Sequence, residues 1–428
     1  MDFPILNGVF LIVSLSTMLL WSTRSAWARR ANIPDVAAFL LVGILVHIAF
    51  RTAGVHISGS IRPLNSPLAM TMAASFVIFW GAAELSPQTL RTVAKPIAAL
   101  ATIGVVVSGA ILGLTVWGAH LAHLPLFAAL LLGAILAGTD PTVLVSIVDQ
   151  VPIADRIREV LIAESALNDP ISAILAVAFL PFATGHAGAS HIWPAVTAQL
   201  WEAAAAVAAG LTAVVFVQSV RRASLPLSRA VMRRTDLRFV LLFLVAFALA
   251  EGASANPFLA GFVAGVAGQP FAHGDSTSSD AAEHRSAAAL HVLSFYVRAY
   301  IFLLLGLTIP TSLQGRSLLP ALLTAGLLIV AARPLSVLAA RLVYRNRLTR
   351  HETIFLCLNR QTGVMPALLI DIFAASGLAQ ADFFRLTAAC AIALTSGVLL
   401  PFFRPLAGRL GLLVPLPPED DADPCCDR

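Results

Sequence analysis

Residues 164–170 read Glu-Ser-Ala-Leu-Asn-Asp-Pro and stand inside a long apolar stretch of the chain. A little earlier, Gly-Thr-Asp-Pro-Thr at 138–142 interrupts another apolar run. Carboxyl groups are costly at the depth of a membrane, and an ion or proton site is the usual reason for keeping one there. Two such segments on neighbouring spans predict a site for a cation near the middle of a bilayer.

The composition indicates a membrane protein along its whole length. The 428 residues are 58% hydrophobic and 12% charged, with a mean hydropathy of +0.85. Apolar runs of about 17–25 residues recur, each long enough to cross the hydrocarbon core as a helix. Barrel strands would alternate apolar and polar residues, and these runs do not. The sequence therefore predicts an all-α polytopic fold.

We expect about thirteen spans, and the first is expected to be a retained helix rather than a signal peptide. They are 4–22, 33–50, 64–85, 96–118, 124–148, 157–182, 195–219, 237–252, 256–271, 290–310, 317–340, 352–376 and 383–402. With the N-terminus outside, 21 of the 28 basic residues fall at cytoplasmic ends and 4 at outer ends. Since basic residues mark the cytoplasmic side, this split predicts an outer N-terminus and a cytoplasmic C-terminus.

The fifth and twelfth spans are both interrupted by polar residues and proline. The interruptions are Thr139-Asp140-Pro141 and, in the twelfth span, the segment 361–366. Seven steps separate the two spans, so they cross the membrane in opposite directions. Broken helices of opposite direction indicate two inverted six-helix repeats with a transport site between them. The membrane domain would be 1–410, with halves at about 1–185 and 237–410, a linker helix at 195–219 and a short cytoplasmic tail at 411–428.

Several classes of function lack support in the sequence. There is no Walker or GxGxxG motif for an ATP-driven pump, and the four cysteines and ten histidines show no metal-type spacing. No repeated filter sequence indicates a channel. A channel or sensor on a transporter scaffold is kept as the remoter alternative. We expect no enzyme activity and no cofactor, and the net charge of +5 reflects cytoplasmic arginines rather than nucleic-acid binding.

Four polar side chains of the sixth span fall on one helix face. Glu164, Ser165, Asn168 and Asp169 cover an arc of about 140° at about 100° per residue. They offer the oxygen ligands that hard monovalent cations prefer. A carboxylate removed from water can hold a proton or a cation at ordinary pH but not both, and Asp169 is the best candidate. Backbone carbonyls near Thr139 could complete the shell.

A second carboxylate one turn away requires neutralisation. Glu164 would repel Asp169 if both were charged and bare. Arg333, in Ala332-Arg333-Pro334 of the eleventh span, is a candidate partner. Buried pairs of this kind more often support the architecture than carry chemistry, so we expect a structural ion pair.

These motifs resemble those of cation/proton antiporters of the NhaP and Na+/H+-exchanger type. Gly-Thr-Asp-Pro-Thr and Glu-Ser-Ala-Leu-Asn-Asp-Pro carry the resemblance, with further matches at 251–252, 258–265 and 332–334. The resemblance implies that Asp169 binds the cation or proton and that Ser165 and Thr139 add ligands. Asp140 would act through water or as a support. Relatives are homodimers, and a role in pH homeostasis in the cell (inner) membrane follows from the same resemblance.

The resemblance also bears on stoichiometry. Asn168 stands where an electrogenic relative has a second aspartate, which implies electroneutral exchange of one cation for one proton. Glu84 resembles an acid that lines the inner funnel of the family. Sodium, with lithium, is the expected cation, and potassium is the alternative. The family commonly has an Arg-Gly pair in the twelfth span, but Thr362 precedes Gly363 here and Arg360 lies upstream. The roles of Arg360 and of Arg298 stay open.

Overall fold

The computed structural model describes an all-helical chain. The described residues are 35–52, 67–83, 85, 87–139, 144, 151–185, 192–222, 235–269, 280–308, 315–344, 347–375, 377–399 and 402–414. Within these ranges the extended structure is a single isolated antiparallel β-bridge between Ile153 and Leu413. The predicted all-α fold is confirmed. The first predicted span, 4–22, lies outside the described residues, and the count of thirteen stays a prediction.

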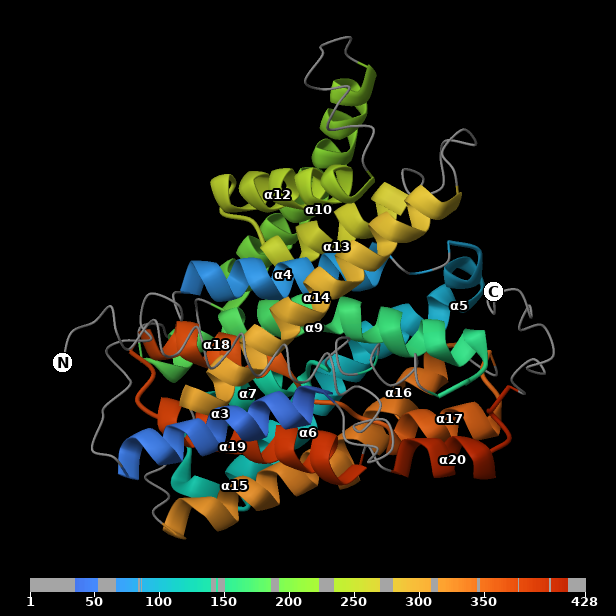
Figure 1. Ribbon diagram of the computed structural model, residues 1–428. Helices are drawn as coiled ribbons and strands as arrows, with labels where there is room; N and C mark the ends of the chain where they lie inside the picture. The colour runs from blue at the N-terminus through green and yellow to red at the C-terminus, as the bar shows by residue number, and fades with distance from the viewer. Residues whose placement is uncertain are drawn as a thin grey trace.

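One group of helices is joined by packing against α13 (Pro257–Gly268) and α14 (Asp280–Thr308). Its other members are α3 (Asp35–Thr52), α4 (Pro67–Ala83), α10 (Ile192–Arg222) and α12 (Thr235–Gly252). In Figure 1, α4 and α13 lie on one side of α9, α10 and α12 lie farther out, and α14 runs diagonally across the view towards α3. Trp201, Phe216 and Leu244 on the outer helices expose large apolar side chains, as helices in contact with lipid do.

A second group holds both interrupted spans. It comprises α5 (Pro87–Ala99), η1 (Leu100–Gly104), α6 (Val105–Gly118), η2 (Leu121–His123), α7 (Leu126–Ala137), α9 (Asp155–Ala183), α15 (Gly315–Leu327), η5 (Leu328–Ala332), α16 (Arg333–Tyr344), α17 (Arg350–Leu358), α18 (Val364–Ala375), α19 (Ala381–Ile392), η6 (Ala393–Leu399) and α20 (Phe403–Arg409). The three stretches α5–η1–α6, α15–η5–α16 and α19–η6 each continue through a π-helical turn.

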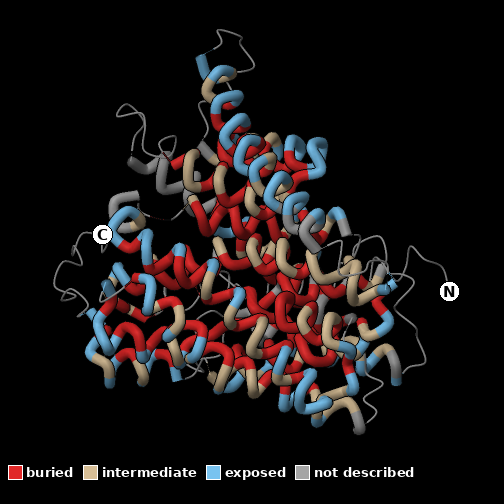
Figure 2. The backbone as a smooth tube through the Cα atoms, turned by 180° about the vertical axis from the view of Figure 1, so that it is seen from behind, coloured by how far each residue is buried: buried red, intermediate tan, exposed pale blue. Residues whose placement is uncertain are grey.

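Helix α9 lies in the middle of the molecule. It packs against α4 and α13 on one side and against α5, α6 and α7 on the other. Buried residues concentrate around this position, and exposed ones line the outer helices (Figure 2). The sixth predicted span, 157–182, thus corresponds to a helix with neighbours in both groups, and its polar face is enclosed by protein.

Both predicted interruptions fall close to the expected residues. Helix α7 ends at Ala137, and Gly138 is extended with φ −60° and ψ 148°. Helix α17 ends at Leu358, and residues 359–363 form a non-helical segment before α18 begins. Two half-helices therefore end inside the protein with their C-terminal carbonyls, which need partners there.

Local sequence signals explain where several helices begin. Asn256 caps α13, because its Oδ1 accepts from the backbone N–H groups of Phe258 at 3.0 Å and Leu259 at 3.1 Å. Thr349 and Glu352 form a capping box at the start of α17. Close crossing of α6 and α7 requires glycine at position 133, since a β-carbon there would collide with the Gly109 carbonyl.

Residues 412–414, at the end of the described ranges, form backbone hydrogen bonds with the residues just before α9. The Ala154 N–H donates to the Leu412 carbonyl at 3.0 Å, and the Val414 N–H donates to the Pro152 carbonyl at 2.8 Å. We call residues 412–414 the C-terminal strap. The predicted tail began at residue 411, but the packed body includes the strap, because this pairing satisfies backbone groups next to the first turn of α9.

Five helical stretches are long and apolar enough to cross a membrane. They are Leu90–Gly118, Asp155–Ala183, Leu200–Arg222, Ser317–Tyr344 and Ala381–Leu399. Shorter apolar helices accompany them, including the two half-helices Leu126–Ala137 and Met365–Ala374. The described part of the chain therefore supports a multi-pass membrane protein, as the composition predicts.

Candidate functional site

The predicted polar face of α9 is fully enclosed. Glu164, Ser165, Asn168 and Asp169 are all at most 2% exposed, as is Ser172 one turn further on. The helix continues through Pro170, which has no N–H to donate to the carbonyl four residues earlier. The sequence places these groups on one face, and the packing of the surrounding helices removes that face from solvent.

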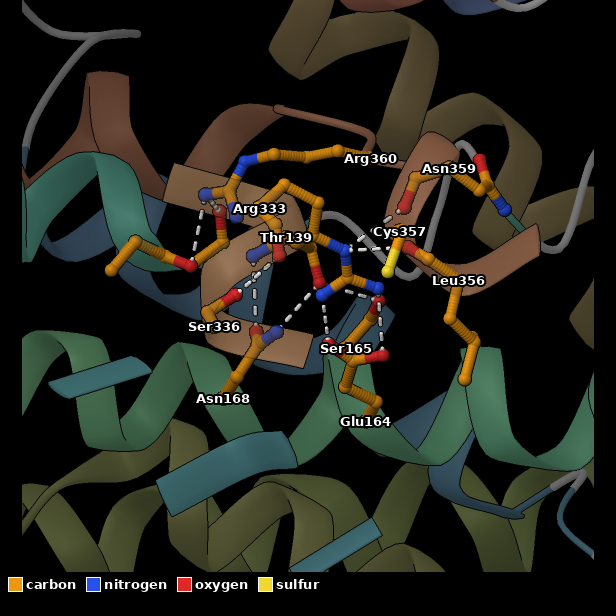
Figure 3. Close-up of polar contacts among 12 residues, drawn as sticks. Thr139, Glu164, Ser165, Asn168, Arg333, Ser336, Leu356, Cys357, Asn359 and Arg360 are labelled. Carbon is orange, nitrogen blue, oxygen red and sulfur yellow. Dashed lines mark hydrogen bonds and ion pairs between the residues drawn. The ribbon is translucent and has the colours of Figure 1, made fainter. Parts of the chain in front are cut away.

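Thr139 joins the broken end of α7 to α9. Its backbone N–H donates to Asn168 Oδ1 at 3.0 Å, and Asn168 Nδ2 donates to Thr139 Oγ1 at 2.6 Å. A backbone N–H can only donate, so it fixes which end of the Asn168 amide is oxygen. The hydroxyls of Thr139 and Ser165 lie 2.7 Å apart. Figure 3 shows these three side chains converging where α7 ends.

The carboxylate of Asp169 lies against the same break. A β-carbon built on Gly138 would be 2.8 Å from Asp169 Oδ1 and 3.4 Å from Ser172 Oγ. Ser172 itself donates to the Ala134 carbonyl at 2.5 Å. The carboxylate, two hydroxyls and one amide thus gather at the end of α7, which is the ligand chemistry that a small monovalent cation or a proton requires.

Glu164 and Arg333 form a buried ion pair. Arg333 Nη2 donates to Glu164 Oε2 at 3.0 Å, and Arg333 Nη1 donates to Glu164 Oε1, so the pair is bidentate. Arg333 Nε also donates to the carbonyls of Leu356 at 2.9 Å and Asn359 at 3.1 Å. Arg333 therefore pairs with the acid on α9 and caps the C-terminal end of α17 at once.

Arg360 caps the other half-helix. One of its Nη atoms donates to the carbonyl of Leu136, to that of Ala137 at 3.0 Å and to that of Gly138 at 3.3 Å. These carbonyls lie at the negative end of α7, where a cation is stabilised by the helix dipole. Figure 3 shows the two arginines reaching in different directions from neighbouring elements. Arg360 also lies within electrostatic range of Asp169 and Glu164.

The other predicted residues fall outside this cluster or outside the described residues. Glu84 and Asp140 are not among the described residues. Arg298 is buried within α14 and belongs to a different helix group from the two breaks. Within the described ranges, no three His, Cys, Asp or Glu side chains lie together as metal ligands would. Sequence reasoning did not single out Gly138 or Ser172, although both stand beside the predicted motifs.

Opposed broken helices that meet at a buried polar site are the arrangement of a secondary transporter. A model of the family "Sodium/hydrogen exchanger, transmembrane" matches residues 13–406. The chain belongs to the sodium/hydrogen exchanger family.

Individual relatives agree with this assignment. The chain is 30% identical over 343 residues to "K(+)/H(+) antiporter NhaP" of Alkalimonas amylolytica, covering 77% of this chain and 54% of that protein. It is 27% identical over 354 residues to "Probable Na(+)/H(+) antiporter 2" of Methanocaldococcus jannaschii, covering 80% and 79%. The chain thus spans about half the length of the first relative and more of the second.

A solved structure shares the fold. The sodium proton antiporter MjNhaP1 of Methanocaldococcus jannaschii matches with a TM-score of 0.72 and 20% identity, over 94% of this chain and 100% of that one. At this identity the match bears on the fold, and it agrees with the helical architecture described above.

Proposed function

We propose that this protein is a secondary antiporter that exchanges a monovalent cation for a proton across a membrane. The observation that carries the proposal is the position of Asp169, a buried carboxylate next to Gly138 with the hydroxyls of Thr139 and Ser165 nearby. One carboxylate can bind either the cation or the proton. Mutual exclusion on a single group is sufficient for coupled exchange.

Electroneutral exchange follows from the neighbour of Asp169. Asn168 cannot titrate, and both ends of its amide hold Thr139. We therefore assign Asn168 a positioning role, in which it keeps the Thr139 hydroxyl beside the site. With Asp169 as the single carrier, one cation replaces one proton and no net charge moves.

Three further acids and two arginines complete the proposal. Glu84 would guide cations at the inner entrance, and Asp140 would act through water. The pair Glu164–Arg333 supports the site, since the two charges neutralise each other within the fold. Arg360 substitutes for the arginine of the family's Arg-Gly pair, and its guanidinium stabilises the end of α7 next to Asp169.

Sodium, with lithium, is the proposed cation, and potassium is the alternative that the name of the Alkalimonas relative supports. Selectivity depends on cavity size and on the number of ligands. We further propose a homodimer in the cell (inner) membrane, with the N-terminus outside and the C-terminus in the cytoplasm, on the strength of the basic-residue distribution and the resemblance to relatives.

Proteoliposomes with a trapped pH-sensitive dye test the function. Addition of sodium, lithium or potassium outside acidic vesicles should raise the internal pH, and the order of the three half-saturation concentrations gives the selectivity. Vesicles containing Asp169→Asn serve as the control for passive leak. A pH change that is equal in the two preparations, for every cation, would rule out antiport through this site.

A further inference from the structure

The break between α17 and α18 contains a second set of buried polar groups, of which the proposed exchange uses only the Nη end of Arg360. Asn359, Arg360, Gln361 and Thr362 are consecutive and at most 5% exposed. Each has one buried side-chain atom without a hydrogen-bond partner in the described structure, namely Nδ2, Nε, Oε1 and Oγ1 respectively. Ser396 Oγ, on η6, is a fifth such atom. Buried polar groups are nearly always satisfied, so this concentration requires an explanation.

Side-chain pairing within the segment limits where the ligand can bind. Gln361 Nε2 donates to Asn359 Oδ1 at 3.1 Å, which leaves one donor, Asn359 Nδ2, and one acceptor, Gln361 Oε1, on two linked amides. The Thr362 N–H donates to Thr395 Oγ1 at 3.1 Å, which joins the segment to η6 next to Ser396. The orphan groups are therefore Arg360 Nε, the amide pair of Asn359 and Gln361, and a hydroxyl pair made up of Thr362 on the segment and Ser396 on η6.

The chemistry of these groups selects a neutral ligand. A metal cation could use Gln361 Oε1 and the hydroxyl oxygens, but it would leave the donors Asn359 Nδ2 and Arg360 Nε without an acceptor. The guanidinium of Arg333 binds the Asn359 carbonyl, so a positive charge already borders the segment. An anion would leave Gln361 Oε1 without a donor. Water donates and accepts, and a buried water typically makes about three hydrogen bonds.

We propose that the segment 359–362, together with Ser396, is a water-binding site inside the membrane domain. Bound water, about two molecules at roughly three hydrogen bonds each, satisfies Arg360 Nε, the amide pair and the hydroxyl pair, and it holds the segment in its non-helical form. The same segment carries Arg360, whose guanidinium caps α7 beside Asp169. Asn359 and Gln361 are thus positioning residues for Arg360. This role rests on the proposed function, whereas the presence of water does not.

X-ray radiolytic labelling tests for the water directly, because hydroxyl radicals formed from a bound water oxidise the side chains next to it. Met365, in the first turn of α18, is the reporter, and Met70 of α4 is the matched control, since each is 6% exposed. We expect Met365 to be oxidised at least several-fold faster than Met70 in the purified full-length protein. Equal rates for the two methionines would overturn the proposal without any transport measurement.

Two substitutions locate the water. The double variant Thr362→Val with Ser396→Ala removes the hydroxyl pair and should slow Met365 oxidation several-fold. Thr387→Val, on α19, removes a buried hydroxyl that already donates to the Phe383 carbonyl at 2.8 Å, and should leave the rate unchanged. Undiminished labelling in the double variant would contradict the assignment. If that variant does not fold, the comparison of Met365 with Met70 in the wild type decides alone.

A final measurement separates water from a cation. Labelling of Met365 is repeated with sodium, lithium, potassium or choline at equal ionic strength. A neutral ligand predicts the same rate in all four salts. A saturable decrease in one metal salt would show that the ion displaces the water, and the site would then belong to the transported cation. If the wild-type protein showed no antiport in proteoliposomes while Met365 was still oxidised faster than Met70, that result would count against the proposed function. It would leave the water site standing.

Discussion

The carboxylate of Asp169 lies so close to Gly138 that a β-carbon on this glycine would be 2.8 Å from Oδ1. The glycine has φ −60° and ψ 148°, a conformation that any residue can adopt. Glycine is therefore needed at this position because a side chain would fill the space beside the carboxylate. The backbone conformation itself does not require it. The end of α7 and the polar face of α9 therefore pack closely together at this contact.

Gly138→Ala should impair cation binding without unfolding the protein. The added methyl group requires Asp169 to move, and we expect a loss of apparent cation affinity of roughly tenfold, about 1.4 kcal/mol. Gly326→Ala is the control, because a β-carbon there meets nothing within 4 Å. Half-saturation concentrations in proteoliposomes provide the measurement. Equal affinities for the two variants would mean that this contact does not shape the site.

Asp169→Asn should abolish exchange and leave the fold nearly intact. The amide keeps the shape of the carboxylate but cannot titrate, and loss of a buried charge removes a desolvation cost. Asp155→Asn, an exposed position in the first turn of the same helix, is the matched control and should transport normally. Thermal unfolding should differ little between the two. If Asp169→Asn transported at the wild-type rate, Asp169 could not be the group that carries the cation or proton.

Glu164→Gln and Arg333→Met should each destabilise the protein, by about 3–5 kcal/mol in the limit of full burial, because each leaves a charge without its partner. The double variant should recover the electrostatic part of this loss. It should not recover all of it, since Arg333 also holds the carbonyls of Leu356 and Asn359. The exposed pair Asp382–Arg385 provides a comparison and should show a coupling of less than about 1 kcal/mol. Strictly additive losses would show that Glu164 and Arg333 act independently.

Exchange should be independent of membrane voltage and should depend on pH in a bell shape. At low pH, protons occupy Asp169 and block the cation, and at high pH too few protons bind for the return step. Below the pH at which the site titrates, apparent cation affinity should weaken about tenfold per pH unit, since each cation displaces one proton. Proton flux in vesicles clamped with valinomycin measures this. Rates that follow the imposed potential would require a second charge in the cycle.

Removal of the C-terminal strap should destabilise the start of α9. A chain that ends at Gly411 loses the hydrogen bonds from Ala154 and to Pro152, and at about 1 kcal/mol for each bond it should unfold at a lower temperature. A chain that ends at Val414 keeps both bonds and is the control. Thermal unfolding in detergent compares the two. Identical melting temperatures would assign the strap no part in stability.

Much of this architecture follows from local sequence. Apolar runs predict the spans, polar breaks with proline predict both half-helix ends, and helical spacing places Glu164 to Asp169 on one face. The pairing of Glu164 with Arg333 could be anticipated because an isolated buried charge is so costly.

Other features depend on contacts between distant segments. Arg360 caps the end of α7 instead of pairing with a carboxylate, and the C-terminal strap pairs with the loop before α9. Neither arrangement has a signal in the local sequence. The start of α14 at Asp280, ten residues before the predicted span at 290, also escaped prediction, because polar residues at 280–289 extend the helix beyond its apolar run. Gly138 was visible in the sequence, but its use depends on the approach of α9.

The separation of Glu164 and Arg333 by 169 residues has a consequence for biosynthesis. When the ribosome delivers α9 to the membrane, the arginine that will neutralise Glu164 has not yet been made. The same holds for Arg360 and the carbonyls of α7, which are 222 to 224 residues apart. The first half must therefore wait with its acid protonated or in contact with water, and its polar face closes only when the second half arrives. Formation of the Glu164–Arg333 pair is therefore a late event in the synthesis of the chain.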